Sequence, residues 1–318
     1  MVITNPAAGG DPLGLAQTAL ERGVRAAAKV EVRHTEHPGQ AEEIAAELAG
    51  GGSGTMPDLV IAVGGDGTAR DVAAGLYRAG AERSRPVPAL LVAPGGTGNS
   101  SYLGIWQDRP WTEVLDRVLG DVGTEVRWLD LARVVETGRI VLLGAGSGLI
   151  AEALVTARDL PGRSGRDRYQ RALHETVARW RPYPGRVTVD GEVLAEGGTL
   201  LVNIGGGRYR GGGYRLLPDS LLDDGLLDVC VCGDSASAAE LAALAVDGRH
   251  VAHPAVRYGR GTLVAVERTD GAPLVFEHDG DLAAITVERF TVEVLAHSVP
   301  MVVPTPPPAG LSPSGRPS

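Results

Sequence analysis

Short apolar runs alternate with helix-like stretches through the first 120 residues, and this alternation is the strongest constraint on the fold. The apolar runs read MVIT, VEVRH, DLVIAV and VPALLVA, and helical patterns occupy residues 12–28, 39–49, 68–79 and 109–119. Such alternation is typical of parallel strands joined by crossover helices. The sequence therefore predicts an α/β domain with a parallel sheet over residues 1–125.

Each predicted strand is followed by a polar loop, and glycine is frequent in these loops. The loops read NPAAGG, TEHPGQ, GGDGT and PGGTGN. Ligands of open α/β sheets bind at the carboxyl ends of the strands, so these loops are expected to face one crevice. Glycines let the backbone approach a ligand closely, and a helix that begins at Thr68 would direct free N–H groups at a phosphate.

Asp66 is the unexpected residue in such a loop, because a carboxylate repels phosphate. A divalent cation between the two anions, usually Mg²⁺, would resolve the conflict. The alternative is that GGDGT is an ordinary glycine turn in which the aspartate caps a helix. The second loop, PGGTGN followed by two serines, adds further N–H and hydroxyl donors and favours a nucleotide site.

From about Val126 the pattern changes to short β-rich runs, interrupted by helical stretches near 150–181 and 235–247. This pattern predicts a second domain, an antiparallel β-sandwich over residues 126–297. The end of the chain, 304–318, is rich in proline and serine and has little apolar surface to bury. We expect it to be disordered.

The overall charge excludes several classes of protein. The net charge is −9, with 39 acidic and 30 basic residues, which argues against a nucleic-acid partner. Lys29 is the single lysine, so a P-loop kinase with its phosphate-binding lysine is excluded. No apolar run approaches the roughly 18 residues of a membrane span, so we expect a cytoplasmic protein in which Cys230 and Cys232 are reduced.

Taken in order, several motifs resemble the diacylglycerol kinase catalytic-domain family, which includes bacterial lipid kinases and sphingosine kinases. They are NPAAGG, GGDGT, PGGTGN, WLDLARV, the long stretch NIGGGRYRGGGYRLLPDSLLDDGLLDV, and HDGD. GGDGT alone also occurs in NAD kinases. The resemblance implies a nucleotide domain of the NAD kinase and diacylglycerol kinase type, a β-sandwich domain, a cleft between them, and a last strand near 298–303 that returns to the first domain.

The resemblance also implies binding residues for ATP and Mg²⁺. Asp66 and Asp130 resemble aspartates that organise magnesium, and a second, structural Mg²⁺ is implied at Asp224 and the main-chain carbonyls of Leu221 and Leu226. Without the resemblance, Asp224 would be read as a β-turn residue. The residues implied to bind ATP are Asn5, Thr35, Gly64, Gly65, Asp66, Gly67, Thr68, Gly95, Gly96, Thr97 and Asn99.

The chain departs from the family pattern at three positions. Ser100 stands where an aspartate usually follows the second glycine loop, Gly148 stands where many members have an aspartate, and Asp281 replaces a glutamate. A catalytically decayed nucleotide- or lipid-binding protein therefore stays an alternative to an active kinase.

The expected activity is ATP- and Mg²⁺-dependent phosphorylation of a hydroxyl on a diacylglycerol-like lipid, a reaction of phospholipid biosynthesis. We predict Asp281 as the base that accepts the hydroxyl proton, with Asp279 orienting it. The alternative for both is a solvated Asp-Gly turn. Arg208, Arg210 and Arg215 would suit phosphate charge if they face the cleft. An NAD kinase-like enzyme is the other alternative.

The stretch from 158 to 183 concentrates seven arginines and adds Tyr169, Trp180 and Tyr183. Such a run is often a solvated helix face. Its alternative is peripheral contact with the anionic inner face of a membrane, which an enzyme acting on a lipid needs. A homodimer is compatible with the sequence, which does not decide the oligomeric state.

Overall fold

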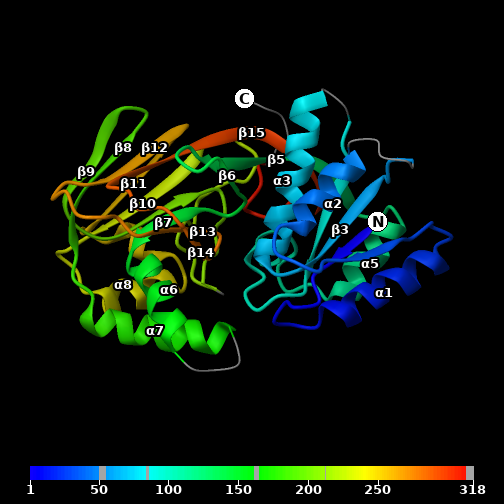
Figure 1. Ribbon diagram of the computed structural model, residues 1–318, viewed down its shortest axis with the longest axis horizontal. Helices are drawn as coiled ribbons and strands as arrows, with labels where there is room; N and C mark the ends of the chain where they lie inside the picture. Colours follow the sequence, from blue (N-terminus) through cyan, green and yellow to red (C-terminus); the bar gives the residue numbers. More distant parts are fainter. Residues whose placement is uncertain (50–54, 84–85, 161–164, 212, 313–318) are drawn as a thin grey trace.

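The computed structural model describes residues 1–49, 55–83, 86–160, 165–211 and 213–312, and it shows two domains side by side (Figure 1). One domain has helices around a parallel sheet, and the other is built from antiparallel strands. The predicted fold class is therefore confirmed.

The N-terminal domain follows the predicted alternation, with one additional helix. Its sheet has the order β15-β4-β3-β1-β2, and neighbouring strands of this order run parallel. The additional helix, α4, directly follows the second glycine loop. The elements are β1 (Val2–Thr4), α1 (Pro12–Arg25), β2 (Val32–His34), α2 (Gln40–Ala49), β3 (Leu59–Gly64), α3 (Asp66–Arg83), β4 (Ala89–Pro94), α4 (Ser100–Trp106) and α5 (Trp111–Leu119).

The C-terminal domain is an antiparallel sheet system, and its described α-helices, α6, α7 and α8, lie on one side of it (Figure 1). Its strands follow the order β14-β13-β7-β9-β8-β12-β15, and β10 and β11 extend from β9. The elements are β5 (Thr124–Val134), β6 (Arg139–Val141), β7 (Ala145–Gly148), α6 (Leu149–Asp159), α7 (Gly165–Arg179), β8 (Tyr183–Val189), β9 (Glu192–Gly205), β10 (Leu227–Gly233), α8 (Ala238–Ala245), the short 3₁₀ helix η1 (Arg249–Ala252), β11 (Val256–Gly261), β12 (Leu263–Arg268), β13 (Phe276–His278), β14 (Asp281–Leu282) and β15 (Arg289–Pro304).

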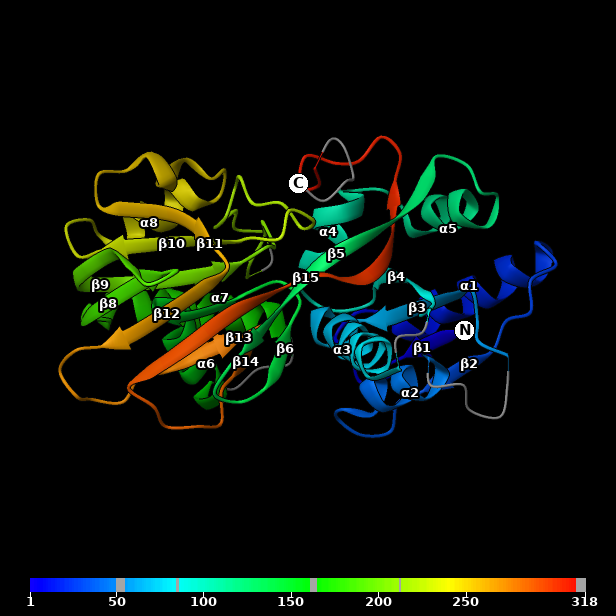
Figure 2. The same cartoon turned by 90° about the horizontal axis from the view of Figure 1, so that it is seen from above.

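Two long strands, β5 and β15, run through both domains and join them (Figure 2). β15 pairs with β12 in the second domain, and Met301 near its end pairs in parallel with Leu90 of β4. The pairing of β15 with β5 shifts register between Leu295 and Val299, where β15 passes from one domain to the other. The last strand thus lies in the first sheet, as the family resemblance implied.

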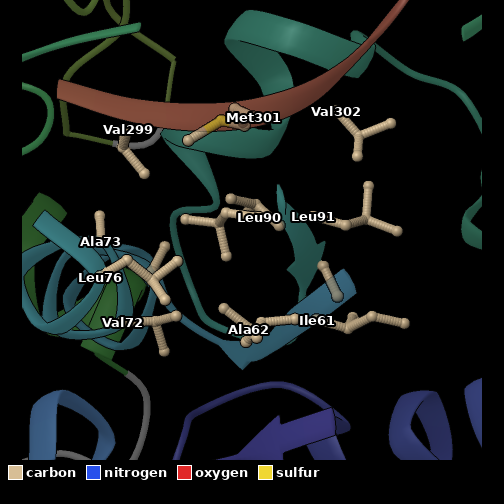
Figure 3. Packing of buried hydrophobic residues seen from close by; sticks show 14 of the residues in the cluster. Ile61, Ala62, Val72, Ala73, Leu76, Leu90, Leu91, Val299, Met301 and Val302 are labelled. Carbon is tan, nitrogen blue, oxygen red and sulfur yellow. The ribbon is translucent and has the colours of Figure 1, made fainter. Parts of the chain in front are cut away.

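The core of the N-terminal domain forms where β15 covers β4 and α3 (Figure 3). Leu90, Leu76 and Met301 are each 1% exposed or less, so they remove nearly all of their apolar surface from water. In the second domain, Phe276 and Phe290 stack with ring centroids 4.3 Å apart. Each domain therefore has a hydrophobic core that holds its strand ends in place.

The segment 305–312 differs from the expected disordered tail. Leu311 is 3% exposed and belongs to the core of the N-terminal domain. The Ser312 amide donates a hydrogen bond to Asp223 Oδ1 at 2.7 Å. Burial of Leu311 and hydrogen bonds such as that of Ser312 hold this proline-rich stretch against the rest of the protein. The rest of the predicted tail, 313–318, lies outside the described residues.

Within the described ranges, no helix combines the length and the apolar character needed to cross a bilayer.

Candidate active site

The two glycine loops of the N-terminal domain pack directly against each other. A Cβ atom on Gly96 would lie 2.1 Å from Gly65 Cα, and one on Gly95 would lie 2.8 Å from the Gly64 amide nitrogen. Both distances are shorter than any real contact, so neither position can hold a larger residue without backbone movement. The close contact between the two loops therefore requires glycine at both positions, whether or not a ligand also approaches them.

Asp66 joins the first loop to the helix that follows the second. Its Oδ2 accepts a hydrogen bond from the Ser100 amide at 3.0 Å, and its Oδ1 accepts bonds from the Ser101 amide and hydroxyl, both at 2.9 Å. Asn99, the residue before α4, instead bonds to Gly96 through both its amide oxygen and nitrogen. Asp66, the first residue of α3, thus caps the start of α4, and this contact fixes the direction of its carboxylate.

A cavity of about 280 Å³ lies between the domains, and residues of both domains form its wall. The N-terminal domain contributes Asp66 and the second glycine loop, while the C-terminal domain contributes α6, α7 and the turn after β13. The lining residues that carry polar side chains are Asp66, Thr97, Ser100, Tyr169, Arg210, Glu277 and Asp279.

The other predicted nucleotide residues do not line this cavity: Gly64 ends β3, Gly67 and Thr68 begin α3, and the remainder lie in loops. The Asn5 side chain donates to Thr68 Oγ1 at 3.3 Å and accepts from the Ala7 amide at 3.0 Å. The Thr35 amide bonds to the Thr4 carbonyl at 2.9 Å. The loops after β1, β2 and β3 therefore gather at one edge of the sheet, as predicted.

Asp279 has a structural role that the sequence did not indicate. Its fully buried carboxylate accepts hydrogen bonds from the amides of Leu142, Leu143 and Gly144, at 2.8 to 3.2 Å. Its backbone has a φ of +49°, a conformation that few residues other than glycine adopt. Asp279 thereby holds the loop between β6 and β7 against the turn after β13.

Asp281, two residues further on, has a different environment. Its side chain is 61% exposed, and Arg70 Nη1 donates to its Oδ2 at 2.7 Å. Arg70 belongs to α3, so this ion pair crosses the cleft between the domains. Asp279 and Asp281 therefore have separate partners, and Asp279 does not orient Asp281 by contact.

Glu277 is a cavity residue that the sequence reasoning missed. Its side chain is 3% exposed, forms an ion pair with Arg210, and accepts a hydrogen bond from the Gly280 amide at 2.9 Å. Burial raises the pKa of Glu277, although Arg210 opposes the shift. An acidic residue inside the apolar run PLVFEH was the signal that could have found it.

Arg210 is the buried partner of Glu277. Burial opposes its charge, but Glu277 and Asp279 outweigh that cost and raise the pKa of the guanidinium above its ordinary value. Arg208 and Arg215 lie elsewhere: Arg208 donates to the Ser220 carbonyl at 3.1 Å, and Arg215 lies near α8. Of the three arginines considered from the sequence, Arg210 lines the cavity between the domains.

The predicted metal ligands do not all gather at this cavity. The Asp130 carboxylate accepts hydrogen bonds from the amides of Gly225 and His297, at 2.7 and 2.8 Å, and lines a separate cavity. Burial raises its pKa despite these bonds. Asp66 and Asp130 therefore do not face one shared site.

The predicted second magnesium site already has a positive charge. Arg260 forms an ion pair with Asp224, whose Oδ1 also accepts a bond from the Leu226 amide at 3.1 Å. The carboxylate that this second cation would use therefore already pairs with a guanidinium. Among the described residues, no group of three histidine, cysteine or acidic side chains is arranged to hold a metal.

Asp66 suits a magnesium ion better than Asp224 does. Three hydrogen bonds occupy its two oxygens, and a carboxylate can accept about four. Mg²⁺ usually needs one or two protein carboxylates and takes its other ligands from phosphate and water. A single aspartate at a cavity wall is compatible with that chemistry.

One departure from the family pattern has a steric explanation. Gly148 has a φ of +74°, and a Cβ atom there would lie 2.4 Å from the Leu200 carbonyl oxygen. Aspartate cannot fit at this position without a change in the backbone. Ser100, at another departure, is 4% exposed and donates its amide to Asp66.

A parallel-sheet domain, an antiparallel domain joined to it by two strands, and a cavity between them make up the architecture of this chain. Two family models match accordingly. Residues 1–134 match the diacylglycerol kinase catalytic domain, and residues 144–302 match the YegS C-terminal NAD kinase beta sandwich-like domain.

Curated proteins and solved structures agree with this class. A protein named "probable lipid kinase YegS-like" from Xanthomonas euvesicatoria is 29% identical over 296 residues, covering 90% of this chain and 89% of that protein. The "probable lipid kinase YegS" of Salmonella arizonae is 30% identical, covering 72% of each chain. A diacylglycerol kinase structure from Bacillus anthracis shares the fold, with a TM-score of 0.68, 23% identity and 96% of each chain covered. This chain belongs to the YegS-like lipid kinases, within the diacylglycerol kinase catalytic-domain family.

Proposed function

We propose that this protein uses ATP and Mg²⁺ to phosphorylate a hydroxyl group of a diacylglycerol-like lipid. The observation that carries the proposal is a second, smaller cavity of about 50 Å³ that shares part of its wall with the cleft. The two cavities share Ile150, Tyr169, Arg210 and Gly211 in their walls. A cleft that carries acidic and arginine side chains, next to an almost wholly apolar cavity, suits a molecule with a polar head and a hydrocarbon tail.

The second cavity lies beneath the helices of the C-terminal domain and is mainly apolar. Leu173 of α7, Leu201 of β9 and Leu241 of α8 contribute to its wall, and three alanines of α8 leave room beside them. Burying a methylene group here would contribute about 0.8 kcal/mol. The cavity would therefore hold the first part of an acyl chain.

The N-terminal domain supplies the groups that suit the nucleotide. Bound Mg²⁺ would neutralise charge on the γ-phosphoryl group during transfer. Asp66 is oriented to hold that ion, and the first N–H groups of α3, which have no partner within a helix, favour phosphate. We propose Asp281, on the opposite side of the cleft, as the acceptor of the lipid hydroxyl proton.

The purified chain is expected to transfer radiolabelled phosphate from ATP to diacylglycerol in mixed micelles, in the presence of Mg²⁺. Asp281→Asn should lower kcat by roughly 10²-fold with little change in the KM for ATP, because it removes the base without touching the glycine loops. Product formation is measured by lipid extraction, with NAD as a parallel acceptor.

Phosphorylation of NAD instead of the lipid would contradict the proposal and identify an NAD kinase-like enzyme. ATP binding without transfer to either acceptor would indicate a decayed enzyme. Unchanged turnover in Asp281→Asn would show that Asp281 is not the base, and the proposed lipid kinase activity would stand.

We further propose that the face around Arg158 and Arg168 meets an anionic membrane. These exposed arginines line a hollow together with Asp281 and Leu282, next to the turn that borders the cleft. Lipid head groups would thus attract the protein at the side where its cleft opens. Residues 161–164 of the basic stretch lie outside the described residues.

The variant Arg158→Gln/Arg168→Gln should bind vesicles of anionic lipid about 30-fold more weakly, since each basic residue near such a surface contributes about 1 kcal/mol. The matched control is Arg25→Gln/Arg289→Gln, which removes two exposed arginines outside this hollow. Sedimentation with vesicles at low and high salt measures the effect. An equal loss of vesicle binding in both double variants, or vesicle binding that does not change with salt concentration, would contradict a local membrane surface.

A further inference from the structure

Among the described residues that line both the cleft and the apolar cavity, Arg210 has the one charged side chain. Its side chain is 8% exposed, and its position is fixed by three contacts. Nη1 donates to the Gly144 carbonyl at 2.8 Å, Nη2 pairs with Glu277, and Asp279 Oδ1 lies 3.8 Å from Nη1. A guanidinium is thus held rigidly at the point where head group and tail of a lipid would meet.

The surrounding charges indicate what kind of group Arg210 can recognise. Glu277 and Asp279 already balance its positive charge, so an anionic ligand would meet two carboxylates as well as one guanidinium. A guanidinium has five N–H groups, and within the described residues two of them form hydrogen bonds. The arrangement therefore suits an uncharged hydrogen-bond acceptor.

We propose that Arg210 donates a hydrogen bond to the ester carbonyl of the acceptor lipid and so selects acyl lipids over ether-linked lipids. This inference rests on the proposed lipid kinase function. In a diacylglycerol, the ester carbonyl lies between the free hydroxyl and the acyl chain. With the hydroxyl in the cleft and the chain in the apolar cavity, the carbonyl comes to the shared wall, beside Arg210.

Glu277 acts through Arg210 and is a positioning residue. One of its carboxylate oxygens pairs with the Arg210 guanidinium, and the other accepts a hydrogen bond from the Gly280 amide. Glu277 therefore connects Arg210 to the turn that precedes Asp281. A lysine in place of Arg210 would keep the charge but lose the planar set of donors.

The test compares 1,2-diacylglycerol with the 1,2-dialkylglycerol of the same chain length, which lacks both carbonyls. The wild type should prefer the ester lipid by 10- to 100-fold in kcat/KM, because a hydrogen bond from a charged donor to a carbonyl is lost with the ether. Arg210→Met/Glu277→Gln, which removes both members of the ion pair and leaves Asp279 its three backbone amide donors, should reduce this preference to about twofold. Arg210→Lys should give an intermediate ratio.

Arg215→Met is the matched control, because this nearby arginine lines neither cavity. It should keep the wild-type ratio. Equal use of ester and ether lipids by the wild type, or a preference that survives Arg210→Met/Glu277→Gln in a folded protein, would overturn the inference and leave the lipid kinase function standing. Failure of the wild type to phosphorylate either lipid would overturn the proposed function itself.

Discussion

Asp66→Asn is expected to lower turnover by about 10³-fold, because it removes the carboxylate that faces the cavity between the domains. The variant also places an amide N–H₂ group where Asp66 now accepts the amides of Ser100 and Ser101. Two donors would then face each other, and the start of α4 should be weakened by about 1–3 kcal/mol. Turnover at saturating Mg²⁺ and the thermal unfolding midpoint measure the two effects separately.

Ser101→Ala provides the control for the helix end. It removes the hydroxyl that bonds to Asp66 Oδ1 and keeps the carboxylate. We expect a small loss of stability and a small change in turnover. If Asp66→Asn retains near wild-type turnover, the carboxylate only caps α4. The same conclusion follows if Ser101→Ala loses as much turnover as Asp66→Asn.

Asp279→Ala is expected to lower the free energy of unfolding by about 3–5 kcal/mol. The side chain is fully buried, and its loss leaves three amides without their acceptor and removes one of the two carboxylates near Arg210. Thermal unfolding followed by circular dichroism measures the change.

Asp281→Ala is the matched comparison, because it removes an identical side chain two residues away. This carboxylate is 61% exposed and pairs with Arg70, so its loss should change stability by less than about 1 kcal/mol. Similar destabilisation in both variants would contradict the structural role assigned to Asp279.

The parallel sheet and its glycine loops could be predicted from the sequence because they follow from local order along the chain. A buried parallel strand is a continuous apolar run, as in LVIAVG of β3, and the residues after it must lie at the carboxyl edge. The motifs also identified the family, since they are short segments whose order along the chain is visible without any contact. Asp66 was found in this way.

The partners of the site residues could not be predicted, because they come from remote parts of the chain. Asp279 binds amides 135 to 137 residues away, and Glu277 meets Arg210 across 67 residues. Periodicity and composition carry no information on such pairs. The spacing of Asp279 and Asp281 therefore suggested a shared function that their separate environments do not support.

The sequence by itself thus determined the two-domain architecture, the position of the glycine loops and the acidic residue between them, because apolar patterning and turn chemistry are local properties. Only the tertiary structure decided that Asp66 caps α4, that Gly148 excludes aspartate, and that Leu311 enters a core. Each of these depends on which atoms approach from elsewhere in the chain. Pairing of β3 with β4 and of β7 with β9 brings the first two sets of atoms together, and hydrogen bonding and steric exclusion then assign each residue its role.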